Sequence, residues 1–400
     1  MRSYKLDKDA LVRRNQMLTA AFHQRPLQHM VRHYMLRSMS KFPYTPLPKP
    51  MNRILFIKPD HIGDMLLATP AIRAVKQADT ATEIHVLAGP WAANILANYK
   101  EIDRVLTINF PGFDRNEEKT SMLAPYQYLI HVSRNLRRLN YSAAIILRPD
   151  HWWGAMLAHA SGIRRRIGYN VKDVSPFLSE SIPLQNEHVI QQNMRLVDTW
   201  ADSAAPMDIH YTFEPSDEDR DYAASYLQHV GISKKRLLCV HPGSGSWTKL
   251  WEDEKWAAVA DTLTEQFDFA VIFTGTMAEQ STVTSIKSHM RYPAFSAAGD
   301  LSLGQLAALY QHASAVLGAD SGPMHLAAAV DAPTVSLFGP ADPVEFKPWG
   351  DSDRQMVLTS HIGCRPCRIL DWGDDPPEYH PCVRNIPVSD VLDAARRVMR

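Results

Sequence analysis

The feature that most constrains this chain is a series of alternating buried strands and helices, which is interrupted and then followed by a second such series. The first series predicts strands at 53–57, 83–88, 104–108 and 143–147, and helices at 64–77, 91–98, 125–139 and 152–161. The second predicts strands at 236–240, 269–273, 315–318 and 333–338, with a helix at 252–267. Such alternation is typical of a parallel sheet covered by helices. We therefore predict an α/β protein with two Rossmann-like domains facing each other across a cleft.

The chain length predicts the number of domains, and the interruption between the two series predicts their boundaries. A chain of 400 residues favours two domains. We expect an N-terminal extension and linker at 1–50, a first domain at 51–205, a connection at 206–235 and a second domain at 236–400. The stretch between the two series also contains a predicted helix at 192–200, the acidic segment 214–219 and another predicted helix at 221–230. Ligands of open α/β sheets bind at the carboxyl ends of the strands, so we look for the site there.

Composition excludes several classes of protein. The 43 basic and 43 acidic residues balance, so nothing calls for a nucleic-acid partner. No apolar run approaches the roughly 18 residues that span a bilayer, and no apolar stretch typical of a signal peptide follows the charged start. Four cysteines in 400 residues do not resemble a secreted disulfide scaffold. We expect a cytoplasmic protein.

The first 50 residues are unusually basic. They contain ten Lys or Arg residues against only Asp7 and Asp9. Apolar side chains recur there at helical spacing: Leu27, Met30, Val31, Tyr34 and Met35. This pattern predicts a basic amphipathic helix that rests on the inner face of the cytoplasmic membrane, a helix docked on the protein's own body, or a loose tail. The proline-rich segment 42–50 reads as an extended linker.

The segment 318–329 has the composition of an anion-binding turn between a strand and a helix. Gly318 and Gly322 allow a sharp turn, and Asp320 or Ser321 can cap a helix that starts at the following proline. A helix start offers N–H groups and a positive dipole end, which suit a diphosphate. His325 lies in the first turn of this predicted helix.

A second glycine turn, at 241–251, follows another predicted strand. Small residues there, Gly243 and Ser244 among them, let backbone N–H groups approach phosphate oxygens, and Lys249 adds a mobile positive charge. An ordinary glycine turn with a surface lysine is the alternative. We expect both turns to leave carboxyl ends of strands in one sheet.

The turn after the first strand, at 58–71, carries a carboxylate where a helix is expected to begin. Asp64, after Gly63, is either an N-cap or a general base that faces a cleft. The turn is neither a GxGxxG loop nor a Walker A loop, which argues against a dinucleotide dehydrogenase and a P-loop enzyme.

Together these segments resemble glycosyltransferase family 9, whose best-known members are ADP-heptose:lipopolysaccharide heptosyltransferases. The matching segments are 53–57 through 63–64 to 70–71, then 241–243 with Lys249 and Trp251, then 320–323 with His325, and finally 338–343. The resemblance spans residues 52 to about 397 and leaves the first 50 residues outside. It implies a GT-B fold, acceptor binding by the N-terminal half, sugar-nucleotide binding by the C-terminal half, and an inverting transfer that needs no metal.

The resemblance also implies roles for individual residues. Asp64 matches the catalytic base, and Ser244 and Lys249 match the diphosphate contacts. The other donor-site residues implied are Gly243, Asp320, Ser321, Gly322 and His325. Glu279 falls near a nucleoside-contacting acid, although Thr274-Gly275-Thr276 replaces a turn richer in glycine and proline. Arg148, directly after a predicted strand, is our candidate for acceptor binding.

The implied reaction moves a sugar, heptose from ADP-heptose first among the candidates, to a lipid-linked or lipopolysaccharide-core acceptor. One alternative keeps the fold but glycosylates a protein or another surface glycan. Another is a sugar-nucleotide-binding protein without catalysis, against which the retained Asp64 weighs.

The C-terminal cysteines form a separate pattern. Cys364, Cys367 and Cys382, with His380 close by, have spacing that suits a structural zinc or iron site. Reduced thiols that stabilise a loop, or a labile disulfide, are the alternatives. None of these cysteines is assigned to catalysis, for which no cofactor is expected.

Overall fold

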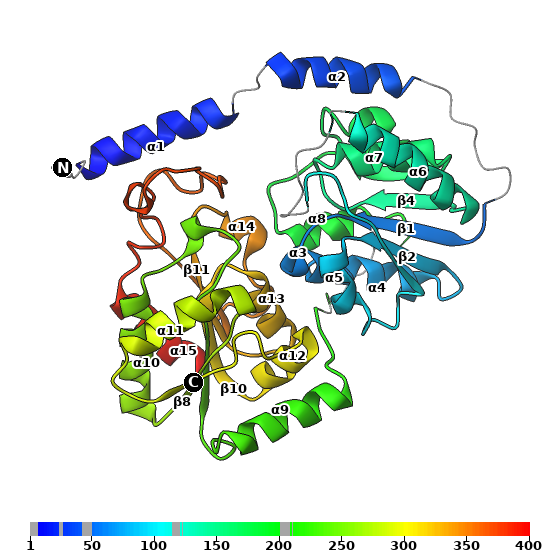
Figure 1. The fold of residues 1–400 in the computed structure, drawn as a ribbon. Coiled ribbons are helices and arrows are strands. Elements are labelled where there is room, and N and C mark those ends of the chain that lie inside the picture. Colours follow the sequence, from blue (N-terminus) through cyan, green and yellow to red (C-terminus); the bar gives the residue numbers. More distant parts are fainter. Residues whose placement is uncertain are drawn as a thin grey trace. The chain divides into compact units, whose positions relative to one another are not determined.

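A computed structural model describes residues 7–23, 27–41, 50–113, 121, 123–200, 209 and 211–400. The chain divides into two compact units, one made of Arg25–His210 and the other of Met1–Gln24 with Tyr211–Arg400. The two helices of the N-terminal extension therefore belong to different units (Figure 1). Of the expected linker at 42–50 only Pro50 is described, and the start of the expected connection, 206–208, lies outside the described residues.

The unit Arg25–His210 is built on a six-stranded parallel sheet with the order β3-β2-β1-β4-β5-β6. Its strands are β1 Arg53–Lys58, β2 Glu83–Ala88, β3 Arg104–Thr107, β4 Ala143–Ile146, β5 Arg165–Tyr169 and β6 Glu180–Ile182. Its helices are α2 Leu27–Met39, α3 Ile62–Leu66, α4 Thr69–Ala78, α5 Pro90–Leu96, α6 Ala124–Arg138, α7 Trp152–Ala160 and α8 Val189–Arg195, with a 3₁₀ turn, η1, at Ser175–Phe177. Residues of β1 alternate between two core clusters, Ile54 and Phe56 in one, Leu55 and Ile57 in the other. Helices thus cover both faces of the sheet.

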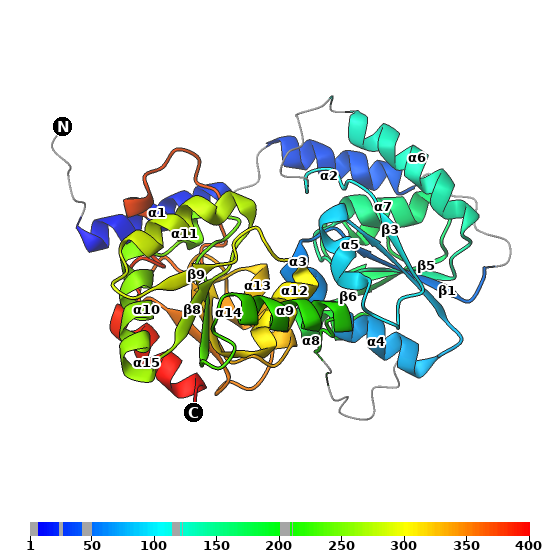
Figure 2. The same cartoon turned by 60° about the horizontal axis from the view of Figure 1, so that its bottom comes forward.

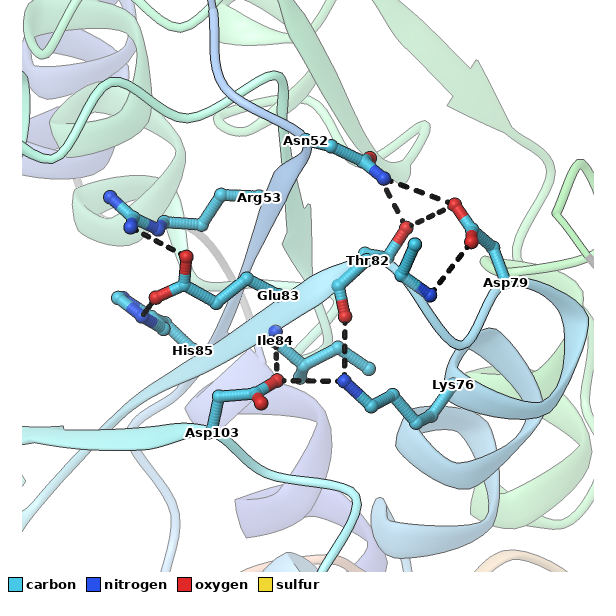
Figure 3. A network of polar contacts seen from close by, with 10 residues as sticks. Asn52, Arg53, Lys76, Asp79, Thr82, Glu83, Ile84, His85 and Asp103 are labelled. Atoms are coloured by element: carbon cyan, nitrogen blue, oxygen red, sulfur yellow. Dashed lines mark hydrogen bonds and ion pairs between the residues drawn. The ribbon is translucent and has the colours of Figure 1, made fainter.

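The amino ends of β1 and β2 are joined by a polar network (Figure 3). Glu83 accepts a hydrogen bond from Arg53 and pairs with His85 at 2.7 Å. Asp103 accepts from the backbone N–H of Ile84 at 2.8 Å and from Lys76 at 3.0 Å. The charged side chains of this network are paired within it, so we assign this edge of the sheet a structural role.

The other unit has the same plan, with the strand order β12-β11-β10-β7-β8-β9. Its strands are β7 Leu237–His241, β8 Ala270–Phe273, β9 Ala294–Ser296, β10 Ala313–Ala319, β11 Thr334–Phe338 and β12 Gln355–Thr359. Its helices are α1 Lys8–His23, α9 Asp217–His229, α10 Asp253–Phe267, α11 Gln280–Ser288, α12 Leu303–Gln311, α13 Gly322–Ala329, α14 Pro343–Phe346 and α15 Val388–Val398. Three 3₁₀ turns complete it: η2 Trp247–Lys249, η3 Met277–Glu279 and η4 Pro377–Tyr379. The predicted α/β class with two Rossmann-like sheets is therefore confirmed.

Several helices in the structure begin or end at other residues than predicted, because of local side-chain chemistry. The helix expected at 64–77 is two helices, α3 and α4, and Pro70 lies in the first turn of α4, where its missing N–H costs no hydrogen bond. The acidic segment 214–219 is partly helical, because Ser216 and Asp219 form a capping box that starts α9 at Asp217. The helix expected at 192–200 is α8, which begins earlier because His188 caps it.

Each N-terminal helix docks on its own unit. In α1, Leu11 is buried, Arg14 pairs with Asp375 at 2.7 Å, and the Asn15 amide donates to the carbonyl of Tyr379 at 2.7 Å. In α2, Leu36 is fully buried in the core cluster that α6 and α7 also line. None of the described helices is long and apolar enough to cross a membrane.

Candidate functional site

Three loops of the C-terminal unit leave the carboxyl ends of adjacent parallel strands. β7 pairs with β10 on one side and with β8 on the other. The glycine turn at 242–246 follows β7, the turn at 320–321 follows β10, and the turn at 274–276 follows β8. Our expectation that the two glycine turns share one edge of one sheet is confirmed.

A buried ion pair joins two of these loops. The Lys249 ammonium lies 2.7 Å from a carboxylate oxygen of Asp320, and the two side chains are only 15% and 6% exposed. The Ser244 hydroxyl donates to the backbone carbonyl of Asp320 at 3.4 Å. Three predicted donor-site residues are thus brought together, and a cation is held beside the start of α13.

The start of α13 differs from the predicted cap. The helix begins at Gly322, one residue earlier than expected, and Ser321 occupies the N-cap position. Asp320 faces Lys249 instead of capping the helix. The Ser321 hydroxyl is buried and has no hydrogen-bond partner among the described residues, and it makes no capping bond to the helix. Pro323 has no N–H, and the Met324 N–H donates to the Ser321 carbonyl at 3.1 Å. The Gly322 N–H is therefore the group that this helix start leaves to another acceptor, as at anion-binding helix starts.

Glu279 lies against the glycine turn. Its carboxylate accepts hydrogen bonds from the backbone N–H and the hydroxyl of Thr276, at 2.7 and 2.9 Å, which closes a capping box. A Cβ atom added to Gly243 would lie 1.9 Å from the Glu279 carboxylate. A side chain at position 243 would therefore have to displace the Glu279 carboxylate from its bonds to Thr276.

Two histidines line this region. His241, at the end of β7, bonds the Thr274 hydroxyl at 3.0 Å, and that hydroxyl contacts the Tyr310 hydroxyl at 3.0 Å. Burial lowers the pKa of His241 to about 4, so the ring is neutral at neutral pH. His325 is buried in α13, and its backbone carbonyl accepts from Tyr211 at 2.9 Å. No role was predicted for His241 from the sequence, although it directly precedes the glycine turn at 242–246.

In the N-terminal unit, Asp64 lies within the short helix α3. The N-cap of this helix is His61, so the interpretation of Asp64 as an N-cap is wrong. Asp64 is half-buried in the first turn, directly after the loop that leaves the carboxyl end of β1.

A charged cluster that was not predicted from the sequence lies at the same edge, between β1 and its neighbour β4. Asp60 pairs with Lys58 at 3.0 Å and with Arg148, and Arg148 also contacts Asp150 at 2.6 Å. Burial by itself raises the pKa of Asp60, but the charges of Lys58 and Arg148 outweigh it and hold that pKa well below its usual range. The sequence signal was the oppositely charged pair Lys58 and Asp60 at the end of a buried strand, and Arg148 is the predicted residue in the cluster.

The C-terminal cysteines do not form the predicted metal site in this arrangement. They line one small pocket with His380, but the described residues contain no group of three or more His, Cys, Asp or Glu side chains that could hold a metal ion. The His380 ring stacks on Trp372, and its Nε2 atom contacts Asp375 at 2.7 Å. Cys364, Cys367 and Cys382 are unbridged, and burial raises the pKa of each thiol. Metal analysis of purified protein tests the prediction directly.

Comparisons with known proteins agree with the fold and the motifs. Lipopolysaccharide heptosyltransferase 3 of Escherichia coli is 28% identical over 344 residues, which cover 84% of this chain and 96% of that protein. The structure of E. coli ADP-heptose LPS heptosyltransferase II superimposes with a TM-score of 0.67 at 19% identity, over 87% of this chain and 98% of that one. The iron-containing dodecameric glycosyltransferase TibC of enterotoxigenic E. coli gives a TM-score of 0.52 at 14% identity, over 88% and 77% of the two chains.

The family model for glycosyltransferase family 9 (heptosyltransferase) matches residues 129–370, which contain the three loops of the C-terminal unit described above and Arg148. The two parallel sheets correspond to the GT-B fold of these neighbours. This chain is a glycosyltransferase, and it belongs to glycosyltransferase family 9.

Proposed function

We propose that this protein transfers a heptose from ADP-heptose to a lipid-linked lipopolysaccharide-core acceptor, at the inner face of the cytoplasmic membrane. The observation that carries the proposal is the buried pair of Lys249 and Asp320 beside the uncapped start of α13. An ammonium and the backbone N–H of Gly322 at a helix start are offered there, and both suit recognition of a diphosphate. The relatives' names supply the sugar and the acceptor class.

In this proposal Asp64 is the general base. Its carboxylate takes the proton of the acceptor hydroxyl while that oxygen forms a bond to the anomeric carbon of the donor sugar. The bond from that carbon to the diphosphate breaks, and ADP leaves with the electron pair. Attack opposite the leaving group inverts the configuration of the sugar.

The departing diphosphate is stabilised by groups of the C-terminal unit. Lys249 and the Gly322 N–H at the start of α13 meet the growing negative charge, and Ser244 donates a hydrogen bond. These groups supply the positive potential that a metal ion supplies in other transferases, so we propose that catalysis needs no cofactor.

The remaining donor-site residues that we propose also belong to the C-terminal unit. Gly243 lets the nucleotide approach the backbone, while Gly322, Ser321 and His325 line the donor site. Glu279 is the proposed nucleoside contact. Its capping bonds to Thr276 support this role because they hold the carboxylate at the glycine turn.

Acceptor binding is assigned to the N-terminal unit. Arg148 is the proposed contact, and phosphate groups on the acceptor would suit its guanidinium. Its ion pairs with Asp60 and Asp150 orient the side chain but offset part of its charge. The net attraction for an anionic acceptor therefore depends on the whole cluster.

The substitution Asp64→Ala tests the base. We expect transfer to fall by roughly 10²–10⁴-fold, the usual contribution of a general base, while ADP binding measured by calorimetry stays unchanged. Asp64→Asn is the matched control for shape. Normal turnover by either variant would show that another group takes the proton.

A panel of sugar nucleotides in a nucleotide-release assay tests the donor. We expect ADP-heptose to be consumed in the presence of lipopolysaccharide-core acceptor. Consumption of a UDP- or GDP-sugar instead would overturn the heptose assignment. Intact-mass detection of a glycosylated protein would favour the alternative acceptor, and no release from any pair would favour a binding protein without catalysis.

A further inference from the structure

One face of helix α2 holds it on the N-terminal unit. Arg32 and His33 both contact Asp173, at 3.2 and 2.8 Å, and the Leu36 side chain is completely buried. The Arg32 guanidinium also lies over the Trp152 ring, at 5.8 Å. In both views of the ribbon α2 runs along the unit beside α7 (Figures 1 and 2). The helix is therefore anchored in a defined rotation about its own axis.

That rotation turns an apolar stripe outward. Met30, Val31, Tyr34 and Met35 are 47%, 62%, 65% and 39% exposed. At roughly 100° per residue, the mean direction of these four side chains lies about half a turn from that of Arg32, His33 and Leu36. Docking on the unit thus does not explain the stripe, and a contiguous exposed apolar face marks an interaction surface.

The surroundings of the stripe are positively charged. The segment 27–41 contains no Asp or Glu. Arg37 lies along one border of the stripe, and Lys41 follows in the turn after α2. With Lys172 they line a surface pocket of about 510 Å³, which His33 also borders. Asp173, the acidic neighbour, is paired with Arg32 and His33. An apolar stripe bordered by cations matches the boundary between acyl chains and anionic headgroups.

We propose that this α2 face, the stripe together with Arg37, Lys41 and Lys172, is the surface by which the protein lies on an anionic lipid bilayer. The four stripe side chains enter the headgroup region, and the three cations meet lipid phosphates. Tyr34 suits the interface because its ring is apolar and its hydroxyl is polar. A second copy of the chain is a poorer occupant, since it would bring the same positive border against itself.

This inference rests on the proposed function only for its purpose, which is to bring the enzyme to a lipid-linked acceptor. Binding to vesicles needs neither donor nor acceptor. A protein that transfers no heptose would still bind, and a true heptosyltransferase could fail to bind. The two proposals therefore fail separately.

The test is co-sedimentation of the full-length protein with vesicles of phosphatidylcholine alone or with about 30% phosphatidylglycerol. We expect binding to the anionic vesicles to exceed binding to the neutral ones by at least about tenfold, and to weaken as salt rises. The double variant Val31→Asp/Tyr34→Asp should lose at least about tenfold in partitioning. Arg37→Glu/Lys41→Glu should remove the preference for anionic lipid.

Ile130→Asp is the matched control, because Ile130 is an apolar residue of α6 in the same unit and is 50% exposed. It should bind vesicles like the unaltered protein. Thermal melts identify any variant that unfolds, and transfer to a deacylated, water-soluble acceptor should be equal in all variants. Equal vesicle binding by the stripe variant and the control would overturn the proposal. So would a dimer in solution that the stripe variant alone dissociates.

Discussion

The pair of Lys249 and Asp320 allows stability and ligand binding to be separated in one experiment. At 2.7 Å, two unit charges attract each other by about 6 kcal/mol at an effective dielectric constant of about 20. Desolvation of both groups offsets much of that attraction, so the pair adds little net stability. Removing one partner is different, because the other charge stays buried.

Lys249→Met therefore leaves the Asp320 carboxylate, which is 6% exposed, without its cation. We expect the free energy of unfolding to fall by about 3–5 kcal/mol. In Lys249→Met/Asp320→Asn neither charge remains, so most of that loss should be recovered. The coupling energy between the two substitutions should exceed about 2 kcal/mol, whereas independent sites add to within about 0.5 kcal/mol.

In the double variant the free energy of unfolding should recover, but the affinity for ADP should not. If Lys249 contacts the diphosphate, ADP affinity falls at least about tenfold in Lys249→Met and stays low in the double variant, since a charge-assisted hydrogen bond contributes about 1.5–3 kcal/mol. Urea unfolding measures the first quantity and titration calorimetry the second. A double variant that binds ADP like the unaltered protein would refute the diphosphate role, and additive stabilities would refute the coupling.

Three further predictions concern other parts of the site. Gly243→Ala should weaken ADP binding at least about tenfold, because its Cβ would lie 1.9 Å from the Glu279 carboxylate and would displace this proposed nucleoside contact. Gly363→Ala, with a nearest contact of 3.4 Å, should not weaken binding, and equal affinities of the two variants in calorimetry would contradict this. Asp60→Asn should lower the free energy of unfolding by about 3–5 kcal/mol, since it removes the negative charge between two cations; an unchanged urea midpoint would argue against a stabilising cluster. The lowered pKa of His241, about 4 against 6.5 for the free group, means that the unfolded chain takes up the proton first as pH falls. Stability contributed by the neutral ring is therefore complete above about pH 6.5 and is lost toward pH 4, at up to about 1.4 kcal/mol per pH unit. His241→Asn should show a correspondingly shallower decline, and an unchanged slope in pH-dependent melts would count against it.

Much of the C-terminal site could be predicted from the sequence because its loops are local. Each consists of a strand, a turn of small residues and a helix start, and the residues that matter are neighbours along the chain. Gly243 and Ser244 follow the end of β7 by two and three residues, and Asp320 and Ser321 follow β10 directly. Since parallel strands place their carboxyl ends at one edge, the alternation alone predicted that these turns would meet.

Contacts between distant segments could not be predicted in this way. The pairing of Lys58 and Asp60 with Arg148 depends on β4 lying beside β1, a choice that periodicity does not specify. The same holds for Glu279, whose carboxylate fills the space at Gly243. Cysteine spacing predicted a metal site, but ligand geometry is a tertiary property, and His380 contacts Asp375.

Helix α2 shows most clearly which properties were predictable from the sequence and which depended on the tertiary structure. Its basic, apolar and amphipathic composition was evident from the sequence, and it was compatible with docking on the protein as well as with a membrane surface. Only the tertiary structure decided which face is used, because the burial of Leu36 and the contacts to Asp173 set the rotation of the helix. The sequence by itself determined the α/β architecture and the chemistry of the loops, since both arise from short-range patterns. Tertiary packing decided which charges meet and which apolar face stays exposed, since these depend on segments far apart in the chain.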